Sequence, residues 1–222
     1  MDILTYLRNW KDQKKGNYLI LALILIFLSL SAVVLFLPTS FVDIRFSEGV
    51  QRYIHPTLNF IMHFISWFGK TWISVSMVAI VAILFLLARF KREALFVLLS
   101  ILISPVNAAI KILISRPRPT EDLVTILYQA KYQSFPSGHV SFYVVFFGFL
   151  IFLMLRLNNA PKSIRYITII FSLILIITVP VSRVYLGVHW FTDVTGGFIL
   201  GLIFLYGLIM LYLKKIKSKP VS

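Results

Sequence analysis

The chain has 222 residues, of which 59% are hydrophobic and only 14% are charged. Soluble domains are about 45–50% apolar and about 25% charged, and one core of this size cannot bury such an excess beneath a polar surface. The composition therefore excludes an ordinary soluble enzyme, a disordered chain and a collagen-like fibre, and it predicts an integral membrane protein. Because the chain has no cysteine, disulfides, thiolate nucleophiles and cysteine metal ligands are also excluded.

Six apolar stretches are long enough, or nearly so, to cross a hydrocarbon core that requires about 20 helical residues. A membrane span must pair its own backbone polar groups, so each stretch is expected to be a helix. The predicted fold class is therefore all-α, a bundle of six transmembrane helices in a single domain (residues 1–222, with the motif-bearing core at 93–213). The predicted spans are Tyr18–Leu37, Trp72–Ala88, Glu93–Ile114, His139–Leu155, Ile164–Val181 and Val194–Leu213.

The distribution of basic residues predicts the orientation. Basic residues also precede the first span, as in a signal peptide, but its apolar run is too long and no small-residue cleavage site follows, so we interpret it as an uncleaved span. With both termini in the cytoplasm, 14 of the 22 Lys and Arg lie on the cytoplasmic side, as the positive-inside rule requires. These are Arg8, Lys11, Lys14, Lys15, Arg89, Lys91, Arg92, Arg156, Lys162, Arg165, Lys214, Lys215, Lys217 and Lys219. We therefore expect a multi-pass protein of a cell membrane, and much of the net charge of +14 reflects topology and anionic lipid rather than nucleic acid.

Two segments differ from the spans. Ile54–Phe68 is apolar but short, and we favour an interfacial or outer-face helix that leads into the second span, the alternative being the frayed top of that span. His55 and His63 within it are interpreted as structural residues. Ser115–Gly138 is a long connection, and loops longer than about 12–15 residues without structure of their own tend to be functional or disordered.

Three polar clusters interrupt the apolar pattern. Spans three and five end, and spans four and six begin, on the same side of the membrane, so the clusters are expected to meet at one surface, the extracytoplasmic one. They are Lys111-x6-Arg118-Pro119, Pro136-Ser137-Gly138-His139 and Ser182-Arg183-x5-His189-x3-Asp193.

The clusters contain the residue types that bind phosphate. Lys111, Arg118 and Arg183 supply three cations, and the planar fork of arginine matches the oxygens of a phosphate. Ser137 and Gly138 open a helix, where unpaired backbone N–H groups attract anions, and Ser137 adds a hydroxyl donor. Together these residues predict a site for a phosphate group.

His189 and Asp193 are four residues apart and share a helix face if the sixth helix begins near Trp190. A carboxylate on one imidazole nitrogen leaves the other nitrogen free to attack, so His189 is the candidate nucleophile. His139 is then the candidate acid that protonates the leaving oxygen. Since the clusters hold no second carboxylate, we expect no metal pair and no cofactor, with the cations stabilising the transition state instead.

These motifs resemble the type 2 phosphatidic acid phosphatase family, part of a superfamily with the vanadium haloperoxidases, whose pattern is KxxxxxxRP, PSGH and SRxxxxxHxxxD. All three blocks occur in order and with the family's spacings. The resemblance implies a metal-independent membrane lipid phosphatase in which His189 forms a phosphohistidine, Asp193 orients it and His139 protonates the leaving group. It also implies that the phosphate is bound by Lys111, Arg118, Ser137, Gly138 and Arg183. The role of Ser182 stays open.

The resemblance further implies a bacterial cell membrane and, as substrate, a lipid phosphate or pyrophosphate in its bilayer, of the undecaprenyl pyrophosphate, phosphatidylglycerophosphate or phosphatidate class. Two other functions stay open. One is a lipid phosphotransferase, in which an alcohol replaces water. The other is a non-catalytic transporter, which would place polar residues deep in several spans. Arg116 adjoins the first motif outside its fixed positions, where it adds to the positive field or only positions the loop.

Overall fold

The computed structural model describes residues 10–217, and all regular structure in that range is helical, which confirms the all-α prediction. The helices are α2 (Trp10–Phe36), α3 (Phe41–Val50), α4 (Pro56–Trp67), α5 (Thr71–Leu87), α6 (Lys91–Leu99), the 3-10 turn η1 (Ser100–Leu102), α7 (Ile103–Ile114), α8 (Gly138–Arg156), α9 (Lys162–Tyr185) and α10 (Phe191–Lys217). Of the predicted cytoplasmic cations, Arg8 and Lys219 lie outside the described residues.

The long helices correspond to the predicted spans. Among the described residues, five segments are long and apolar enough to cross a membrane. The pair α4 and α5, bent by 55° where the two helices meet, makes a sixth if the pair counts as one span. The third span is built from α6, η1 and α7 in succession. The fifth continues past its predicted end at Val181 to Tyr185, which places Arg183 in the last turn of α9.

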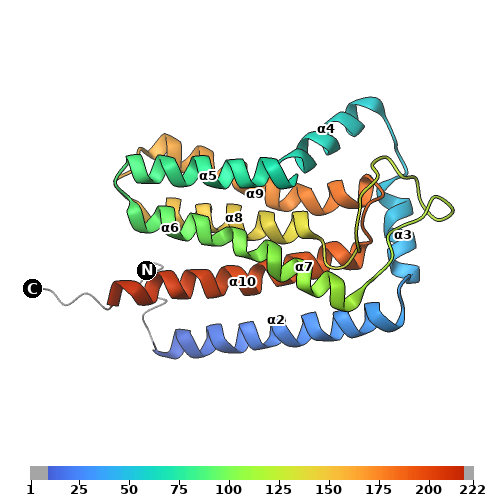
Figure 1. Cartoon of the computed structure of the whole chain (residues 1–222), viewed down its shortest axis with the longest axis horizontal. Helices are drawn as coiled ribbons and strands as arrows, with labels where there is room; N and C mark the ends of the chain where they lie inside the picture. The colour runs from blue at the N-terminus through green and yellow to red at the C-terminus, as the bar shows by residue number, and fades with distance from the viewer. Residues whose placement is uncertain (1–9, 218–222) are drawn as a thin grey trace, which may run out of the picture.

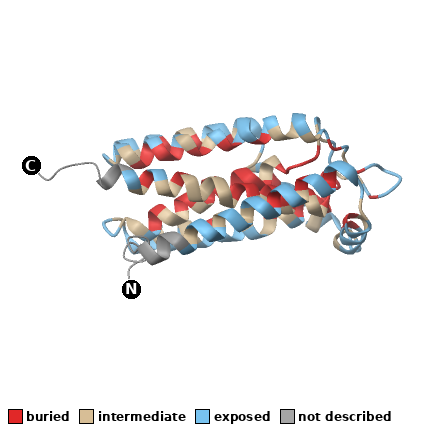
Figure 2. Ribbon diagram, turned by 90° about the horizontal axis from the view of Figure 1, so that it is seen from below, coloured by how far each residue is buried: buried red, intermediate tan, exposed pale blue. Residues whose placement is uncertain are grey.

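Helix α8 is the centre of the bundle. In its most apolar stretch 72% of the residues are buried, against 17–33% in the other four unbent candidate spans. Helix α10 lies against α8 at glycine positions, since a Cβ at Gly201 would lie 2.7 Å from Val144 Cβ. The other helices surround this pair (Figure 1), and their outward faces carry exposed apolar side chains (Figure 2). Such a surface is suited to lipid.

One end of the bundle carries the irregular parts of the chain. The connection 115–137 and α3 lie at this end, whereas α2 begins and α10 ends at the other (Figure 1). The sequence analysis predicted no element at Phe41–Val50, where the structure has α3. The segment 54–68 forms α4, a helix of its own whose N-cap His55 accepts the backbone N–H of Thr57 at 3.3 Å. It is therefore a separate helix leading into α5 and not the frayed top of that helix.

Candidate active site

The three motifs lie together at the α3 end of the bundle. Lys111 is in the last turn of α7, His139 in the first turn of α8 and Arg183 in the last turn of α9. His139 interacts electrostatically with Arg183, His189, Arg118 and Lys111, so all five side chains lie within charge–charge range of one another. The structure therefore brings the predicted site residues into one place.

His189 lies in the link between α9 and α10, and its side chain is only 3% exposed. Its Nδ1 atom is 3.4 Å from Oδ2 of Asp193, in the first turn of α10. The backbone N–H of Trp190 donates to the same carboxylate oxygen at 2.8 Å. The predicted pair is therefore formed, and Nε2 of His189 is the ring nitrogen that does not face the carboxylate.

Burial lowers the pKa of His189 well below its usual range. The cations Arg118, Lys111, Arg183 and Arg116 lower it further, because each makes a second positive charge nearby unfavourable. The imidazole is therefore neutral at physiological pH. A neutral imidazole has the free electron pair that a nucleophile requires.

Main-chain carbonyls of the long connection hold two of the predicted phosphate-binding cations. The Nζ atom of Lys111 donates to the carbonyl oxygens of Gln133 and Ser134 at 2.5 and 3.0 Å. The guanidinium of Arg118 donates to carbonyl oxygens in the segment 131–133 and to that of Val188 at 2.5 Å. Burial lowers the pKa of Arg118, and Asp193 partly opposes this shift. The connection thus fixes the positions of both cations.

Arg183 and Ser137 carry donors that are buried and unpaired. Arg183 is 3% exposed and donates from Nη1 to Ser66 Oγ at 3.1 Å. Within residues 10–217, Arg183 Nε and Ser137 Oγ have no hydrogen-bond partner. Buried polar groups are nearly always paired, so an unpaired one calls for an explanation. Two such donors beside Lys111 and Arg118 fit the oxygens of a phosphate group.

The start of α8 differs in one detail from the expectation. The backbone N–H of Ser137 was expected to be unpaired, but it donates to the carbonyl oxygen of Asp193 at 3.0 Å. Helix α10 approaches closely here, because a Cβ at Gly197 would lie 2.5 Å from the carbonyl oxygen of Ser137. An anion at this helix end would therefore be bound by the N–H groups that follow Ser137 and by its hydroxyl.

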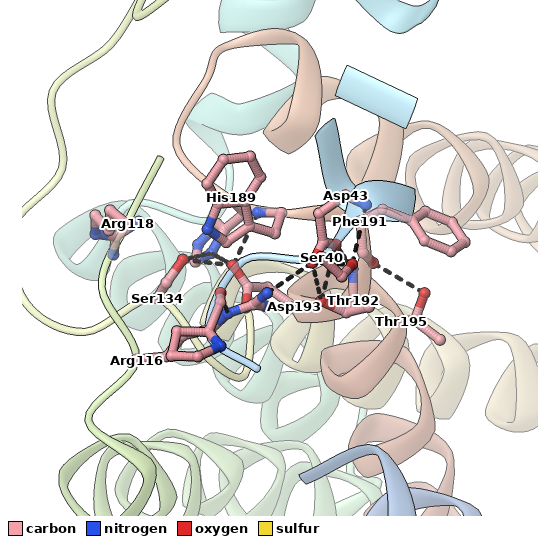
Figure 3. A network of polar contacts seen from close by, with 12 residues as sticks. Ser40, Asp43, Arg116, Arg118, Ser134, His189, Phe191, Thr192, Asp193 and Thr195 are labelled. Atoms are coloured by element: carbon pink, nitrogen blue, oxygen red, sulfur yellow. Dashed lines mark hydrogen bonds and ion pairs between the residues drawn. The ribbon is translucent and has the colours of Figure 1, made fainter. Parts of the chain in front are cut away.

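Arg116 is the main residue of the site that sequence analysis did not place. Its side chain is fully buried and forms ion pairs with Asp43 at 2.7 Å and with Asp193 at 2.5 Å (Figure 3). Asp43 lies on α3, which was also unpredicted. The spacing Ser40-x-x-Asp43 is an N-cap pattern that could have indicated this helix, since Ser40 Oγ accepts the N–H of Asp43 at 3.2 Å.

A cavity of about 430 Å³ lies beside Arg118. Its wall includes Glu121 and Tyr128 of the long connection, together with Gly187 and Val188. Gly187 has φ +70°, and a Cβ there would lie 2.2 Å from a carbonyl oxygen of the connection. Only glycine permits this approach.

The site as described is rich in cations. Across residues 10–217, no group of three or more His, Asp or Glu side chains could hold a metal ion. Divalent cations such as Mg²⁺ prefer carboxylate and carbonyl oxygens, whereas Lys111, Arg118 and Arg183 suit an anion. The arrangement can bind a phosphate and present a neutral, oriented imidazole to it.

Comparison with known proteins gives the same result. Residues 93–217 match the model of the PAP2 superfamily. The chain is 32% identical over 198 residues to phosphatidylglycerophosphatase B of Bacillus subtilis, covering 88% of this chain and 95% of that protein. It is 32% identical over 151 residues to an undecaprenyl-diphosphatase of Sulfolobus acidocaldarius, covering 65% and 66%.

A solved structure has a similar fold. It is described as a transmembrane PAP2-type phosphatidylglycerolphosphate phosphatase from Bacillus subtilis. It superposes with a TM-score of 0.77 at 25% identity, covering 91% of this chain and 98% of the other. The chain therefore belongs to the PAP2 superfamily, whose membrane lipid phosphatases it matches in sequence and in fold.

Proposed function

We propose that the chain hydrolyses a lipid phosphate or diphosphate at the extracytoplasmic face of the membrane, without a metal ion, through a phosphohistidine at His189. Asp193 orients His189, and His139 protonates the leaving group. The transferred phosphoryl group is bound by Lys111, Arg118, Ser137, Gly138 and Arg183. One membrane-embedded domain carries the whole reaction.

The reaction has two steps. In the first, Nε2 of His189 attacks phosphorus in line and the bond from phosphorus to the leaving oxygen breaks. His139, which holds a proton when the anionic phosphate is bound beside it, donates that proton to the leaving oxygen. A lipid alcohol or lipid monophosphate leaves. In the second step, water attacks the phosphorus of the phosphohistidine and the bond from phosphorus to Nε2 of His189 breaks. His139 accepts a proton from that water, and inorganic phosphate is released. The three cations stabilise the charge that spreads over the phosphoryl oxygens.

One observation carries the proposal. The buried His189–Asp193 pair lies in charge–charge range of three cations contributed by three different segments of the chain. A set of snorkelling cations at a membrane edge would not need a buried imidazole among them. Buried positive charge without carboxylate partners is unfavourable, and a site of this kind is maintained for an anionic ligand.

The relatives support a lipid substrate. One is named as a phosphatidylglycerophosphatase and another as an undecaprenyl-diphosphatase. We therefore propose that the substrate is a phosphatidylglycerophosphate or an undecaprenyl diphosphate, with phosphatidate as a further candidate. The leaving group stays anchored in the bilayer in each case.

The first experiment measures phosphate release by the purified protein from these three lipids at matched detergent and lipid concentrations. His189→Ala and His139→Ala are expected to lose turnover while remaining monodisperse on size exclusion. Substrate labelled with ³²P in the terminal phosphate should label the protein with an acid-labile, base-stable phosphoryl group that the His189→Ala variant lacks. A folded wild-type protein that releases no phosphate from any of the lipids would refute the proposal.

A second experiment tests the orientation. The chain has no cysteine, so a single introduced cysteine reports its own position. Asp122→Cys lies in the 115–137 connection and Asn158→Cys in the α8–α9 link, and both positions are exposed. A membrane-impermeant maleimide added to intact cells should label the first and not the second. The reverse pattern would place the site in the cytoplasm.

A further inference from the structure

A buried series of charged side chains connects the nucleophile to helix α3. Asp193 Oδ1 accepts a hydrogen bond from Arg116 Nη1 at 2.5 Å, and Arg116 Nη2 donates to Asp43 Oδ2 at 2.7 Å. The side chains of all three residues are fully buried. Figure 3 shows the three residues in one network of polar contacts with His189. Arg116, in the 115–137 connection, thus joins α3 to α10, and Asp193 on α10 joins this pair of helices to the link that carries His189.

Each side-chain nitrogen of Arg116 and each carboxylate oxygen of Asp43 and Asp193 has at least one hydrogen-bond partner. Besides the two ion pairs, Arg116 donates from Nε to the carbonyl oxygen of Pro38 at 2.8 Å and from Nη1 to Thr192 Oγ1 at 2.7 Å. Asp43 also accepts the backbone N–H of Thr192 at 2.9 Å, the residue directly before Asp193. A network with all donors and acceptors satisfied is rigid. The backbone around Asp193 is therefore held from two sides.

Asp193 needs this support because its own contact with the nucleophile is long. The distance from Oδ2 to His189 Nδ1 is 3.4 Å, while the same oxygen accepts from Ser134 Oγ and from the N–H of Trp190. A carboxylate with several competing donors can rotate away from the imidazole. The bond from Arg116 to the other oxygen, Oδ1, limits that rotation.

We propose that Arg116 and Asp43 are positioning residues for the nucleophile: Arg116 clamps the Asp193 carboxylate against His189, and Asp43 holds Arg116 in that position. The inference rests on the proposed function of His189. Neither residue belongs to the three motifs, and Asp43 lies outside every predicted span. Helix α3 is thereby part of the catalytic apparatus although it contributes no group that touches the substrate.

The charges of Arg116 and Asp43 predict the sign of the change in the pKa of His189 when either residue is replaced. A purely structural role predicts no such sign. His189 is faced by Lys111 from α7, Arg116 and Arg118 from the connection, His139 from α8, Arg183 from α9 and Asp193 from α10. Removing the charge of Arg116 takes away a cation that lowers the pKa of His189, so that pKa should rise. Removing the negative charge of Asp43 acts in the opposite sense and more weakly, through Arg116.

The test compares Arg116→Met, Arg116→Lys and Asp43→Asn in the full-length protein. Positioning of the nucleophile affects the chemical step, so kcat should fall with KM almost unchanged. By analogy with groups that orient metal-bound histidines, we expect a decrease of roughly 10–100-fold. Arg116→Lys keeps the charge but cannot bridge two carboxylates with a planar fork. It should therefore leave the pKa of His189 near its wild-type value while kcat still falls.

The pKa is measured by long-range ¹H–¹⁵N spectra of protein labelled with ¹⁵N-histidine, which also report the tautomer of His189 and do not require turnover. We expect a higher pKa in Arg116→Met and a slightly lower one in Asp43→Asn. The controls are Arg45→Met and Glu48→Gln, which remove the same charges from an exposed ion pair on α3, the helix that carries Asp43. In this pair Arg45 Nη1 and Glu48 Oε2 are 3.3 Å apart. These should alter neither kcat nor the spectra.

The outcomes distinguish the positioning role of Arg116 and Asp43 from the proposed function of the protein, so that either can fail without the other. If the wild-type protein turns over and the folded Arg116 and Asp43 variants match the controls in kcat and in the His189 titration, the inference is wrong. If the variants lose activity only in proportion to lost folded protein, with an unchanged tautomer and pKa, the network is structural and the inference is again wrong. If the spectra shift as stated while the wild-type protein releases no phosphate, the clamp exists and the proposed function fails.

Discussion

The hydroxyl oxygens of Ser66 and Ser182 lie 2.7 Å apart, joining α4 to the last turn of α9. Ser182 also donates to the carbonyl oxygen of Met62 at 2.7 Å, and Ser66 accepts from Arg183 Nη1 at 3.1 Å. Ser182 is thus hydrogen-bonded to Ser66, and Ser66 in turn is hydrogen-bonded to Arg183, the residue next to Ser182. This gives the serine of the third motif a structural task, and it makes α4 a support for the phosphate site.

Ser66→Ala should weaken catalysis through Arg183. The variant loses the hydroxyl that accepts from the guanidinium, a kind of hydrogen bond worth about 1.5–3 kcal/mol when one partner is charged. Because the cation itself remains, we expect only part of this loss, roughly a tenfold decrease in kcat/KM. The measurement is steady-state phosphate release from the preferred lipid.

Ser172→Ala is a matched control for that substitution. Ser172 is buried on the same helix as Ser182, and its Oγ has no hydrogen-bond partner in the part of the chain that the structure describes. Removing this hydroxyl should leave kcat/KM unchanged. Equal losses in Ser66→Ala and Ser172→Ala would mean that the serine–arginine contact has no catalytic importance.

Gly69→Ala should displace the candidate acid. A Cβ at Gly69 would lie 2.3 Å from Cδ2 of His139, far closer than two carbons can approach. The ring of His139 must therefore move, and a shift of about 1 Å at a reacting group can cost roughly 100-fold in rate. We expect a decrease of that order in kcat, measured in the same assay.

Two other glycines show whether the effect is steric. A Cβ at Gly49 on α3 or at Gly207 on α10 would meet no atom within 4 Å. Gly49→Ala and Gly207→Ala should therefore retain wild-type kcat. A folded Gly69→Ala protein with normal kcat would show that His139 can shift without loss, which argues against its role as the acid.

The features that the sequence predicted are those that depend on local pattern. The apolar runs marked the spans because each must satisfy its own backbone, and the ends differ from the helices by only a few residues at most positions. His189 and Asp193 are four residues apart, so a helix that starts beside them brings them together. The parity of the spans placed the three motifs at one end of the bundle.

The features that the sequence did not reveal depend on packing between distant segments. Arg116 and Asp43 are separated by 73 residues, and their contact exists only because α3 turns across the end of the bundle. Ser66 and Ser182 are separated by 116 residues. Neither a periodicity nor a motif spacing connects such pairs. A helix as short as α3, whose buried residues are the polar Asp43 and Ser47, has no apolar pattern that would predict it beside long apolar runs.

The depressed pKa of His189 predicts that acid destabilises the folded protein. In the unfolded chain the imidazole binds a proton near the ordinary pKa of about 6.5. In the folded protein its pKa is well below this, because of burial and the surrounding cations. The unfolded state therefore binds more protons as the pH falls below about 6.5, so the stability present above that pH decreases until the folded pKa is reached.

His189→Asn removes this contribution. Its melting temperature should fall less steeply than that of the wild-type protein between about pH 7 and pH 5, since the ordinary histidine pKa of about 6.5 lies in that interval. The two proteins are compared by thermal unfolding in the same detergent at a series of pH values. Parallel curves would indicate that the imidazole of His189 is protonated as easily in the folded state as in the unfolded chain.

Chelators should leave the reaction intact, because the proposed transition state is stabilised by fixed side-chain cations and not by a divalent ion. Phosphate release in EDTA should equal that of an untreated sample, and added Mg²⁺ should not increase it beyond its effect on the lipid dispersion. Strong inhibition by EDTA that Mg²⁺ or Zn²⁺ reverses would overturn the metal-independent mechanism.

Arg183→Ala should remove transition-state stabilisation. The guanidinium is almost fully buried within charge–charge range of His139, and its Nε has no hydrogen-bond partner within residues 10–217. By comparison with the loss of one oxyanion-hole donor, we expect a cost of about 3 kcal/mol or more, which is roughly 100-fold in kcat. Arg165→Ala is the control, because it removes the same charge from the first turn of the same helix, away from the site, where Arg165 donates to the main-chain carbonyl of Met154 at 2.6 Å. Equal kcat values for the two variants would show that Arg183 does not stabilise the transition state. A loss confined to Arg183→Ala would support a contact between its guanidinium and the transferred phosphoryl group.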